Sequence, residues 1–532
     1  WHSPRATPHY LTICSSNLSS KKRVFHGPSA AAEWQYFAEG GAHIILRYFG
    51  SDKSLARKVL RVKKCFCQCE SATGAPSSSP AVSSVGFNDK DLWAGYPGLD
   101  MDERSEEERR HAFVTEVLQP ILGKSFIEAG ELVYVNKSFL REVAASAKSL
   151  RPTFRVSQSD VDYDARYALL LRNHAFISIG EYNCPEAPTY SVEVKPKCGF
   201  LEATSVNGTS RFHMCQALKQ AQLLVHKASD YDPLDLFSRL NFACMLKAGQ
   251  NYTSCSTDQR FSRGRQAFRA LIANPQNNFN LQKNKSSSVE TRDGDIELLP
   301  KYDAVTKDGT SIKDGTIRKD DAQGSAEKLI KDKILVGENP RESCARQMWR
   351  NAKRPCCDDF LNRKCEESVH QETVGRTRLL DLVFNAIICS GVLERILALQ
   401  RLDKVGVDGA VALAASLQGI ARGGLSADAR QNALQLLRDF ITSATAKDCS
   451  VMVTIQRANF DVTPSSQDMF DDDIVVVSLP TRLDYQTHLS QNICEQFLCR
   501  VAVVDLDLKS VYKLPHWLIQ GGKISGAYES RA

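Results

Sequence analysis

Long apolar stretches are missing from this sequence of 532 residues, which has no run of about 18 apolar residues and so predicts no transmembrane helix. Residues 1–30 also lack the positively charged and then apolar pattern of a secretory signal. The net charge is small, because 68 Lys and Arg stand against 62 Asp and Glu, which leaves +6. This balance permits an anionic ligand but gives no reason to expect nucleic acid. With 42% hydrophobic and 24% charged residues, the sequence predicts a globular protein without a membrane partner.

Cysteine pairing is not indicated either. The 17 cysteines are an odd number, and several lie in apolar or helical context, among them Cys389, Cys449 and Cys494. Such cysteines are typical of reduced thiols rather than of a disulfide framework. We therefore expect a cytoplasmic or nuclear protein.

The chain is longer than one simple core requires, so the sequence predicts two lobes. Alternating or strongly apolar segments predict strands within 34–50 and over 56–64, 131–140, 166–176, 449–456 and 499–509. Helical spacing occurs over 107–123, 210–227, 392–405 and 429–446. This mixture predicts an α+β fold. The expected parts are a flexible leader (1–28), an N-terminal lobe (29–172), a C-terminal lobe (173–532) and two insertions (239–260 and 281–340), of which the second has the composition of a disordered segment.

A strand-like segment at 191–200, SVEVKPKCGF, carries alternating charges. Side chains in a strand alternate between the two faces, so we expect Glu193, Lys195 and Lys197 on one face. Pro196 cannot donate to a strand ladder, which predicts a sheet edge or a strand that is leaving its sheet. An ordinary solvated face explains this pattern as well as a binding site does.

The last predicted strand has a similar pattern. In VVDLDLKSVYK (503–513), alternation would place Asp505, Asp507 and Lys509 on one face. Carboxylates at the end of a buried strand are costly unless they are paired or bind a metal, and Mg²⁺ prefers one or two carboxylates together with phosphate oxygens. Asp448, just before another hydrophobic strand, is a third carboxylate of this kind, although aspartates at such places are often only caps.

A glycine turn, EGGAH (39–43), falls between two predicted strands. Rossmann and Walker A loops open a helix, so this placement argues against both. It suits the glycine-rich turn that covers nucleotide phosphates in kinases, although a plain hairpin is the more common explanation of two adjacent glycines. Arg61 lies on the third strand, where protein kinases have a lysine that contacts ATP phosphates.

Six segments together closely resemble inositol-pentakisphosphate 2-kinases and occur in that family's order. The family's EXKPK motif is intact at 193–197. The resemblance skips the leader and both insertions. The segments are EVKPKCGFL (193–201), SRFHMCQALK (210–219), DPLDLFS (232–238), NPQNN (274–278), TAKDCSVMV (445–453) and VVDLDLK (503–509).

The resemblance implies a two-lobed inositol phosphate kinase fold, distantly similar to protein kinases, with long insertions in the second lobe. It also implies transfer of the ATP γ-phosphate to the 2-hydroxyl of inositol 1,3,4,5,6-pentakisphosphate, which gives inositol hexakisphosphate (phytate). Asp505 would hold Mg²⁺, Asp448 would accept the proton of the attacking hydroxyl, and Lys195 would stabilise the charge that moves between the substrates. The ATP positions implied are Glu39, Gly40, Gly41, Ala42, His43, Arg61, Arg172, Asn173, His174, Glu193 and Asp505. The inositol phosphate positions implied are Arg155, Lys195, Lys197, Lys219, Asn277, Lys509, Lys513 and Trp517.

Several positions depart from the family pattern. Cys215 stands where the family has histidine, Arg172 replaces a hinge asparagine, and Asn280 replaces an arginine that approaches ATP. Trp517 keeps the ring but not the hydroxyl of a tyrosine that meets the substrate. Plant members have a zinc site of two histidines and a Cys-x-x-Cys, and its residues are missing from 408–424, so we expect this site to be absent. An independent zinc site is an open alternative, on the irregularly spaced cluster Cys344, Cys356, Cys357, Cys365 and His370.

Two other interpretations compete with an active kinase. The departures at Cys215 and Arg172 suit a catalytically weak scaffold that binds inositol phosphates, although a pure binder has no evident need for two acids beside a polyanion. A nucleic-acid-binding role for 281–340 is disfavoured, because this segment has nearly as many acids as bases and almost no aromatic residues for base stacking. We expect a monomeric kinase acting on a small-molecule substrate.

Overall fold

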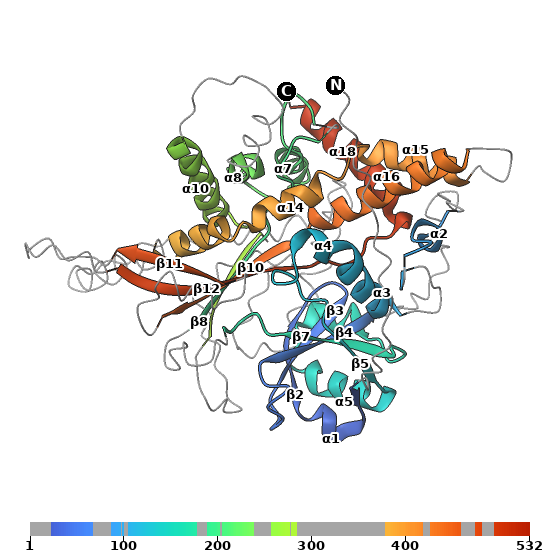
Figure 1. Cartoon of the computed structure of the whole chain (residues 1–532), viewed down its shortest axis with the longest axis vertical. Helices are drawn as coiled ribbons and strands as arrows, with labels where there is room; N and C mark the ends of the chain where they lie inside the picture. The colour runs from blue at the N-terminus through green and yellow to red at the C-terminus, as the bar shows by residue number, and fades with distance from the viewer. Residues whose placement is uncertain are drawn as a thin grey trace, which may run out of the picture. The chain divides into compact units, whose positions relative to one another are not determined.

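The chain folds into helices and mixed sheets, which confirms the α+β prediction (Figure 1). It divides into two compact units: unit 1 is Trp1–Glu70 with Gly130–Arg172, and unit 2 is Ser71–Ala129 with Asn173–Ala532. Residues 71–129, which we expected in the first lobe, thus group with unit 2. The computed structural model describes residues 23–66, 87–96, 98–99, 105–177, 189–202, 205–238, 257–276, 278–284, 378–418, 426–458, 474–480 and 494–531, so most of the expected leader and of both insertions lies outside the description.

Unit 1 is built on a seven-stranded sheet in the order β1-β5-β7-β4-β3-β2, with β6 paired to β4. β1 and β5 are parallel, and the other neighbours pair antiparallel. The β2–β3 hairpin is the strand, glycine turn and strand predicted within 34–50. The strands are β1 (Val24–Phe25), β2 (Trp34–Glu39), β3 (His43–Tyr48), β4 (Lys58–Phe66), β5 (Glu131–Val135), β6 (Ser159–Val161) and β7 (Tyr167–Arg172), and the helices are α1 (Gly27–Ala31), α5 (Lys137–Lys148) and α6 (Thr153–Val156).

The stretch 131–140, predicted as strand throughout, changes to helix at Lys137. The side chain of Asn136 accepts a hydrogen bond from the backbone N–H of Phe139 at 2.8 Å, which caps α5 and ends the strand before it. The helix then buries Phe139, Leu140 and Val143 in the core of unit 1. Each such side chain contributes about 1.5–3 kcal/mol when it is fully buried, so tertiary packing reinforces the cap.

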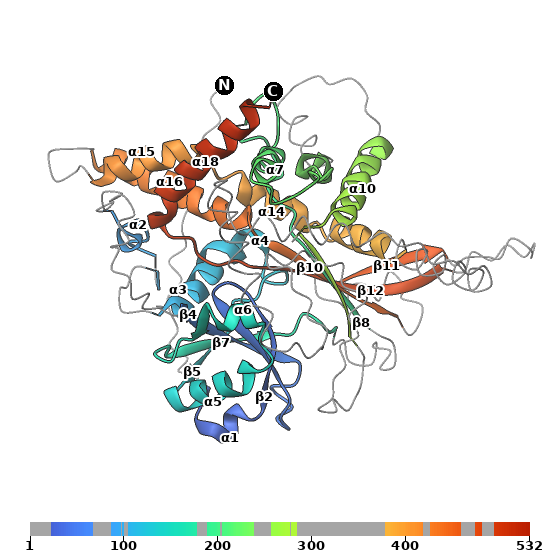
Figure 2. The same ribbon diagram turned by 180° about the vertical axis from the view of Figure 1, so that it is seen from behind.

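Unit 2 contains a five-stranded antiparallel sheet in the order β11-β12-β10-β8-β9. In both views, α7, α10 and α14 lie on the same side of this sheet (Figures 1 and 2). The strands are β8 (Thr189–Val194), β9 (Phe279–Asn284), β10 (Ser450–Arg457), β11 (Ile474–Pro480) and β12 (Cys494–Val504). The helices are α2 (Asp89–Leu92), α3 (Glu106–Phe113), the π-helical η1 (Val114–Leu118), α4 (Gln119–Leu122), α7 (Arg211–Ala221), α8 (Pro233–Leu236), α10 (Thr257–Ala273), Arg378–Cys389, α14 (Val392–Gln400), α15 (Gly406–Gln418), α16 (Ala427–Ala446), the short 3₁₀ turn η5 (Val511–Lys513) and α18 (Leu514–Glu529).

Two of the helices predicted in this unit differ in detail. The predicted helix at 107–123 contains a π-helical turn, η1, directly before Pro120 in α4, because proline has no N–H to continue the ordinary ladder. The helix predicted over 210–227 ends at Ala221, and Leu223 then adopts a left-handed conformation with φ of 57°. The π-helical turn and the helix end at Ala221 both depend on backbone conformation, so the spacing of apolar residues could not predict them.

Two strand ends correct the alternation arguments made from sequence. β8 ends at Val194 and β12 ends at Val504, so Lys195, Lys197, Asp507 and Lys509 lie beyond the strands. Lys197 has φ of 62° and Asp505 has φ of 59°, and this left-handed backbone turns the chain out of each strand. The side chains are therefore not ordered by strand alternation. Pro196 lies in the segment that leaves the sheet, as expected, while β8 itself lies between β10 and β9.

No single helix in the described parts of the chain is long and apolar enough to cross a membrane. One bent pair, Arg378–Cys389 with Val392–Gln400 at 61°, reaches that length and composition only when taken together. Both helices contribute to the buried apolar core of unit 2, which also takes in β8, β10, β12 and α16.

Candidate active site

Three strand ends meet at one end of the unit 2 sheet. β10 runs antiparallel to both β8 and β12, so its first residues lie beside the last residues of its neighbours: Val451 pairs with Val194 and Ser450 with Val504. Glu193, Asp448 and Asp505 thereby come from distant parts of the sequence to one place. The sequence predicted these residues, and the sheet topology explains why they gather.

The first cluster joins the ends of β8 and β12. The Lys195 Nζ donates to Asp505 Oδ2 at 2.9 Å and lies 3.5 Å from Glu193 Oε1. The Ser450 hydroxyl lies 2.8 Å from Glu193 Oε1 and 3.0 Å from Asp505 Oδ2. Burial alone would lower the pKa of Lys195, but Asp505 and Glu193 together raise it, so this lysine stays charged. Sequence reasoning missed Ser450, since a serine at the start of a strand carries no distinguishing signal.

The second cluster surrounds Asp448. Its carboxylate lies 3.6 Å from Lys197 Nζ and accepts a hydrogen bond from Lys509 Nζ at 3.2 Å. Burial would raise the pKa of Asp448, but the charges of Lys197, Lys509 and Lys195 lower it below the usual aspartate value. The side chain is 60% exposed, so solvent screens part of this attraction. The group is thus an ionised, accessible carboxylate flanked by two cations.

The loop after β8 is held by neighbours on several sides. The N–H of Lys195 donates to the carbonyl of Asn278 at 2.9 Å, and the buried Tyr231 hydroxyl donates to the carbonyl of Pro196 at 2.7 Å. Gly199 packs against the ring of Phe237 so closely that a Cβ there would lie 2.5 Å from a ring carbon. The loop therefore has little freedom, and its lysines project from a fixed backbone.

Lys447 anchors the residue before Asp448. Its Nζ donates to Glu202 at 2.6 Å and to Asp403 at 2.8 Å, and all three side chains are largely buried. Burial alone would lower the pKa of Lys447, but Glu202 and Asp403 raise it, so the ion pairs persist at neutral pH. Glu202 follows the loop after β8, so this contact ties that loop to the segment that carries Asp448.

The remaining inositol phosphate candidates of unit 2 lie on α7, η5 and α18. Lys219 donates to Gln276 at 2.8 Å, within the NPQNN segment, while Asn277 itself lies outside the described residues. Burial raises the pKa of the Cys215 thiol, so this residue supplies no charge where the family has histidine. Lys513 is exposed at the end of η5, and the Trp517 ring packs 6.0 Å from that of Phe440.

Asp507 has a partner outside the two clusters. Its carboxylate accepts from Arg110 Nε of α3 at 3.1 Å, and this pair also forms a salt bridge. The predicted shared face of Asp505, Asp507 and Lys509 was therefore wrong, because the chain is no longer a strand at these residues.

Arg172, Asn173 and His174, the three ATP positions that the resemblance places at the hinge, span the sequence boundary between the two units. Arg172 is the last residue of β7 in unit 1. In unit 2, the buried Asn173 side chain accepts from the N–H of Ala175 at 3.0 Å, and the His174 carbonyl accepts from the Thr454 hydroxyl. The side chain of Asn173 and the carbonyl of His174 thus fix the local backbone.

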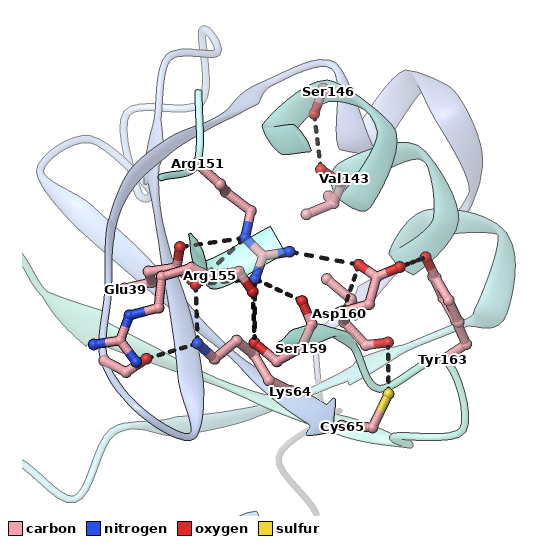
Figure 3. A network of polar contacts seen from close by, with 12 residues as sticks. Glu39, Lys64, Cys65, Val143, Ser146, Arg151, Arg155, Ser159, Asp160 and Tyr163 are labelled. Carbon is pink, nitrogen blue, oxygen red and sulfur yellow. Dashed lines mark hydrogen bonds and ion pairs between the residues drawn. The ribbon is translucent and has the colours of Figure 1, made fainter. Parts of the chain in front are cut away.

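In unit 1, the glycine turn rests on a buried ion-pair network (Figure 3). Glu39 is 2% exposed; it accepts from Lys64 at 2.9 Å and from Arg151 at 3.0 Å. Lys64 also donates to the carbonyl of Gly40 at 2.6 Å. The N–H of Gly40 donates to the backbone carbonyl of His43 across the turn at 3.0 Å. The Glu39 carboxylate is therefore committed to holding the turn. Sequence reasoning missed Lys64 and Arg151.

Two further cations of unit 1 were predicted site residues. Arg61 on β4 contacts His43 Nδ1 at 2.9 Å, so it lies beside the end of the glycine turn. Arg155 on α6 lies over the ring of Phe154 at 5.1 Å and is partly exposed. Arg61 and the turn are thus brought together. The carbonyl of Arg155 accepts from the Ser159 hydroxyl at 3.3 Å, and this hydroxyl also contacts Arg151, so Arg155 borders the same network (Figure 3).

The described residues contain no group of three or more His, Cys, Asp or Glu side chains that could hold a metal. Mg²⁺ needs fewer protein ligands, since it takes one or two carboxylates with phosphate oxygens and water. Glu193 and Asp505 share the Ser450 hydroxyl and so provide two adjacent carboxylates, which fits this requirement. The cysteine cluster of 344–370 lies outside the described residues.

The chain is similar to proteins of one family. A family model described as inositol-pentakisphosphate 2-kinase matches residues 36–521, which assigns the chain to the inositol phosphate kinases. Within them, it belongs to the inositol-pentakisphosphate 2-kinase family, since the match covers well over half of its length.

Curated relatives carry the same name. The inositol-pentakisphosphate 2-kinase of Arabidopsis thaliana is 27% identical over 525 residues, which cover 94% of each chain. The inositol-pentakisphosphate 2-kinase IPK1 of Oryza sativa subsp. japonica is 26% identical over 524 residues, again 94% of each chain. The inositol-pentakisphosphate 2-kinase of Danio rerio is 31% identical over 128 residues, or 23% of this chain and 26% of the relative.

Proposed function

We propose that this protein transfers the γ-phosphate of ATP to the 2-hydroxyl of inositol 1,3,4,5,6-pentakisphosphate and so produces inositol hexakisphosphate. The observation that carries the proposal is the position of Asp448, an ionised carboxylate that lies between Lys197 and Lys509. Cations attract the phosphates of such a substrate, and a carboxylate among them can accept the proton of a hydroxyl. The names of the plant and fish relatives support the same reaction.

In the proposed reaction, Asp448 accepts the proton of the 2-hydroxyl as its oxygen attacks the γ-phosphorus. A new oxygen–phosphorus bond forms, the bond to the β-phosphate oxygen breaks, and ADP leaves. Lys195 would stabilise the charge on the transferred group, since its ammonium is fixed beside Asp505 and Glu193. Catalysis is then mostly positioning and electrostatic stabilisation, as is usual for phosphoryl transfer.

Asp505 would hold Mg²⁺, with Glu193 as the adjacent carboxylate. When bound there, the ion would neutralise negative charge on the phosphates of ATP.

For ATP we propose the glycine turn 40–43 and Arg61 as phosphate contacts, in a two-lobed fold distantly similar to protein kinases. The Glu39 carboxylate is bound by Lys64 and Arg151, so Glu39 would act by fixing the turn rather than by touching the nucleotide. Further phosphates of the inositol substrate would meet the cations Arg155, Lys219 and Lys513.

The test is an assay with ATP, magnesium and inositol 1,3,4,5,6-pentakisphosphate, with products separated by anion-exchange chromatography. A hexakisphosphate peak that requires both ATP and Mg²⁺ is the expected result. Tight inositide binding without any product would contradict the proposal and favour a binding scaffold instead.

A further inference from the structure

Gln400, the last residue of α14, is fully buried and makes three side-chain hydrogen bonds. Its Oε1 accepts from the N–H of Gly199 at 2.8 Å. Its Nε2 donates to the carbonyl of Lys197 at 2.8 Å and to the carbonyl of Ala446 at 3.2 Å. An amide has two N–H donors, and both are used, together with the oxygen.

These partners belong to two different parts of the site. Lys197 and Gly199 lie in the loop after β8, whereas Ala446 is the last residue of α16, two residues before Asp448. One amide thus ties the backbone that carries a phosphate-binding lysine to the backbone that carries the proposed base. Gln400 itself is fixed, because the Ser443 hydroxyl of α16 donates to the backbone carbonyl of Gln400 at 2.5 Å.

The backbone of Lys197 needs such support. Its φ of 62° is a left-handed conformation that is unfavourable for a residue with a Cβ, and such conformations persist only where surrounding contacts hold them. The hydrogen bond from Gln400 falls on the carbonyl of this same residue. Without it, Lys197 can return to an ordinary conformation, and its ammonium would leave Asp448.

We infer that Gln400 is a positioning residue that fixes the separation of Lys197 and Asp448. It thereby controls how tightly the site binds the phosphates next to the reacting hydroxyl. This inference rests on the proposed function, since it concerns how the same site holds its inositol phosphate substrate. Gln400 does not touch the substrate, and its effect passes through the backbone of Lys197.

A double-mutant cycle tests the inference. Gln400→Leu keeps the size of the side chain but removes all three hydrogen bonds, and it is expected to lower kcat/KM for the pentakisphosphate by about tenfold or more, since small misplacements at a reacting centre are costly. The KM for ATP is expected to stay unchanged. In a Lys197→Met background, the same substitution is expected to cost less than about threefold, because the two residues act together. An equal loss in both backgrounds overturns the inference.

Leu393→Ala is the matched control, because Leu393 is also buried on α14 but lies in the apolar core. It is expected to lower stability while leaving kcat/KM for the pentakisphosphate unchanged. If it lowers kcat/KM as much as Gln400→Leu does, the effect is general destabilisation and the inference is wrong.

A second measurement does not depend on activity. Gln400→Asn keeps the amide but is one methylene shorter, so it covers the case in which the leucine variant does not fold. Hydrogen exchange of the full chain is expected to become faster in the peptide spanning 195–202 for Gln400→Asn but not for Leu393→Ala. Equal exchange in both variants overturns the inference. If the unsubstituted chain forms no hexakisphosphate, the proposed function fails, and this readout still decides whether Gln400 holds the loop.

Discussion

Replacement of Asp448 by asparagine separates the proposed chemistry from binding. The substitution keeps the shape of the side chain and removes its negative charge and its ability to accept a proton. If Asp448 is the general base, kcat is expected to fall by about 10²–10⁴-fold, the usual contribution of such a group.

The structure also predicts what happens to binding and stability. Asp448 interacts with Lys197 at 3.6 Å and with Lys509 at 3.2 Å, and its side chain is 60% exposed. Exposed ion pairs contribute about 0.2–1 kcal/mol each, so the two together account for at most about 2 kcal/mol of folding free energy. Without Asp448, both lysines lose their neutralising partner and are free to attract phosphate. Binding of the pentakisphosphate is therefore expected to stay the same or become tighter.

The assay is single-turnover product formation beside calorimetric titration of the pentakisphosphate. Asp507→Asn is the control, since it makes the same charge change on a nearby aspartate that pairs with Arg110 at 3.1 Å instead. This control is expected to keep most of its turnover. If Asp448→Asn keeps more than about a tenth of the wild-type kcat, far above the loss expected for a general base, Asp448 is not the proton acceptor.

Two further predictions concern the supports of the site. Gly199→Ala places a Cβ 2.5 Å from the fully buried ring of Phe237 and is expected to lower the free energy of unfolding by about 1–3 kcal/mol in urea titrations, whereas Gly522→Ala, with open space in α18, is expected to be neutral or stabilising. Equal effects of the two glycine substitutions would show that packing at 199 is not limiting. Glu39→Gln removes the carboxylate that neutralises the buried Lys64 and leaves Arg151 with Asp160, at 3.6 Å, as its remaining carboxylate partner. It is therefore expected to destabilise unit 1 by about 3–5 kcal/mol in hydrogen-exchange measurements. Unchanged exchange in β2 and β3 would contradict this role.

The sequence named candidate residues, but local patterns did not predict their geometry. The family resemblance implied separate ATP-site roles for Glu193 and Asp505, and the structure brings the two carboxylates together on the Ser450 hydroxyl. The alternation argument, which grouped Glu193 with Lys195 and Lys197 and grouped Asp505 with Asp507 and Lys509, failed. Lys197 and Asp505 turn out of the strands in left-handed conformations. Such a conformation is rare for lysine, and it depends on tertiary contacts that no local pattern reveals.

The supports of the site were not predictable for a related reason. Arg151 binds Glu39 across 112 residues, and Gln400 binds the carbonyl of Lys197 across 203 residues. The sequence alone does not distinguish a buried glutamine or arginine from an exposed one. Its role depends on which backbone groups the fold brings to it, so sequence periodicity could indicate the helices that carry these residues but not their partners.

The position of Asp448 among lysines has one more consequence, which concerns pH. Lys197, Lys509 and Lys195 lower the pKa of Asp448, so the carboxylate is ionised but weakly basic. Phosphate groups that bind these lysines would offset their charge, and the pKa of Asp448 would then rise when the substrate binds. The acid limb of kcat/KM, which reports the free enzyme, is therefore expected at lower pH than the acid limb of kcat, which reports the bound complex. Lys509→Met removes one of the lowering charges and is expected to move the acid limb of kcat/KM to higher pH, towards that of kcat. If the two limbs coincide in the wild type, or if Lys509→Met moves the limb to lower pH, the lysines do not control the protonation of Asp448.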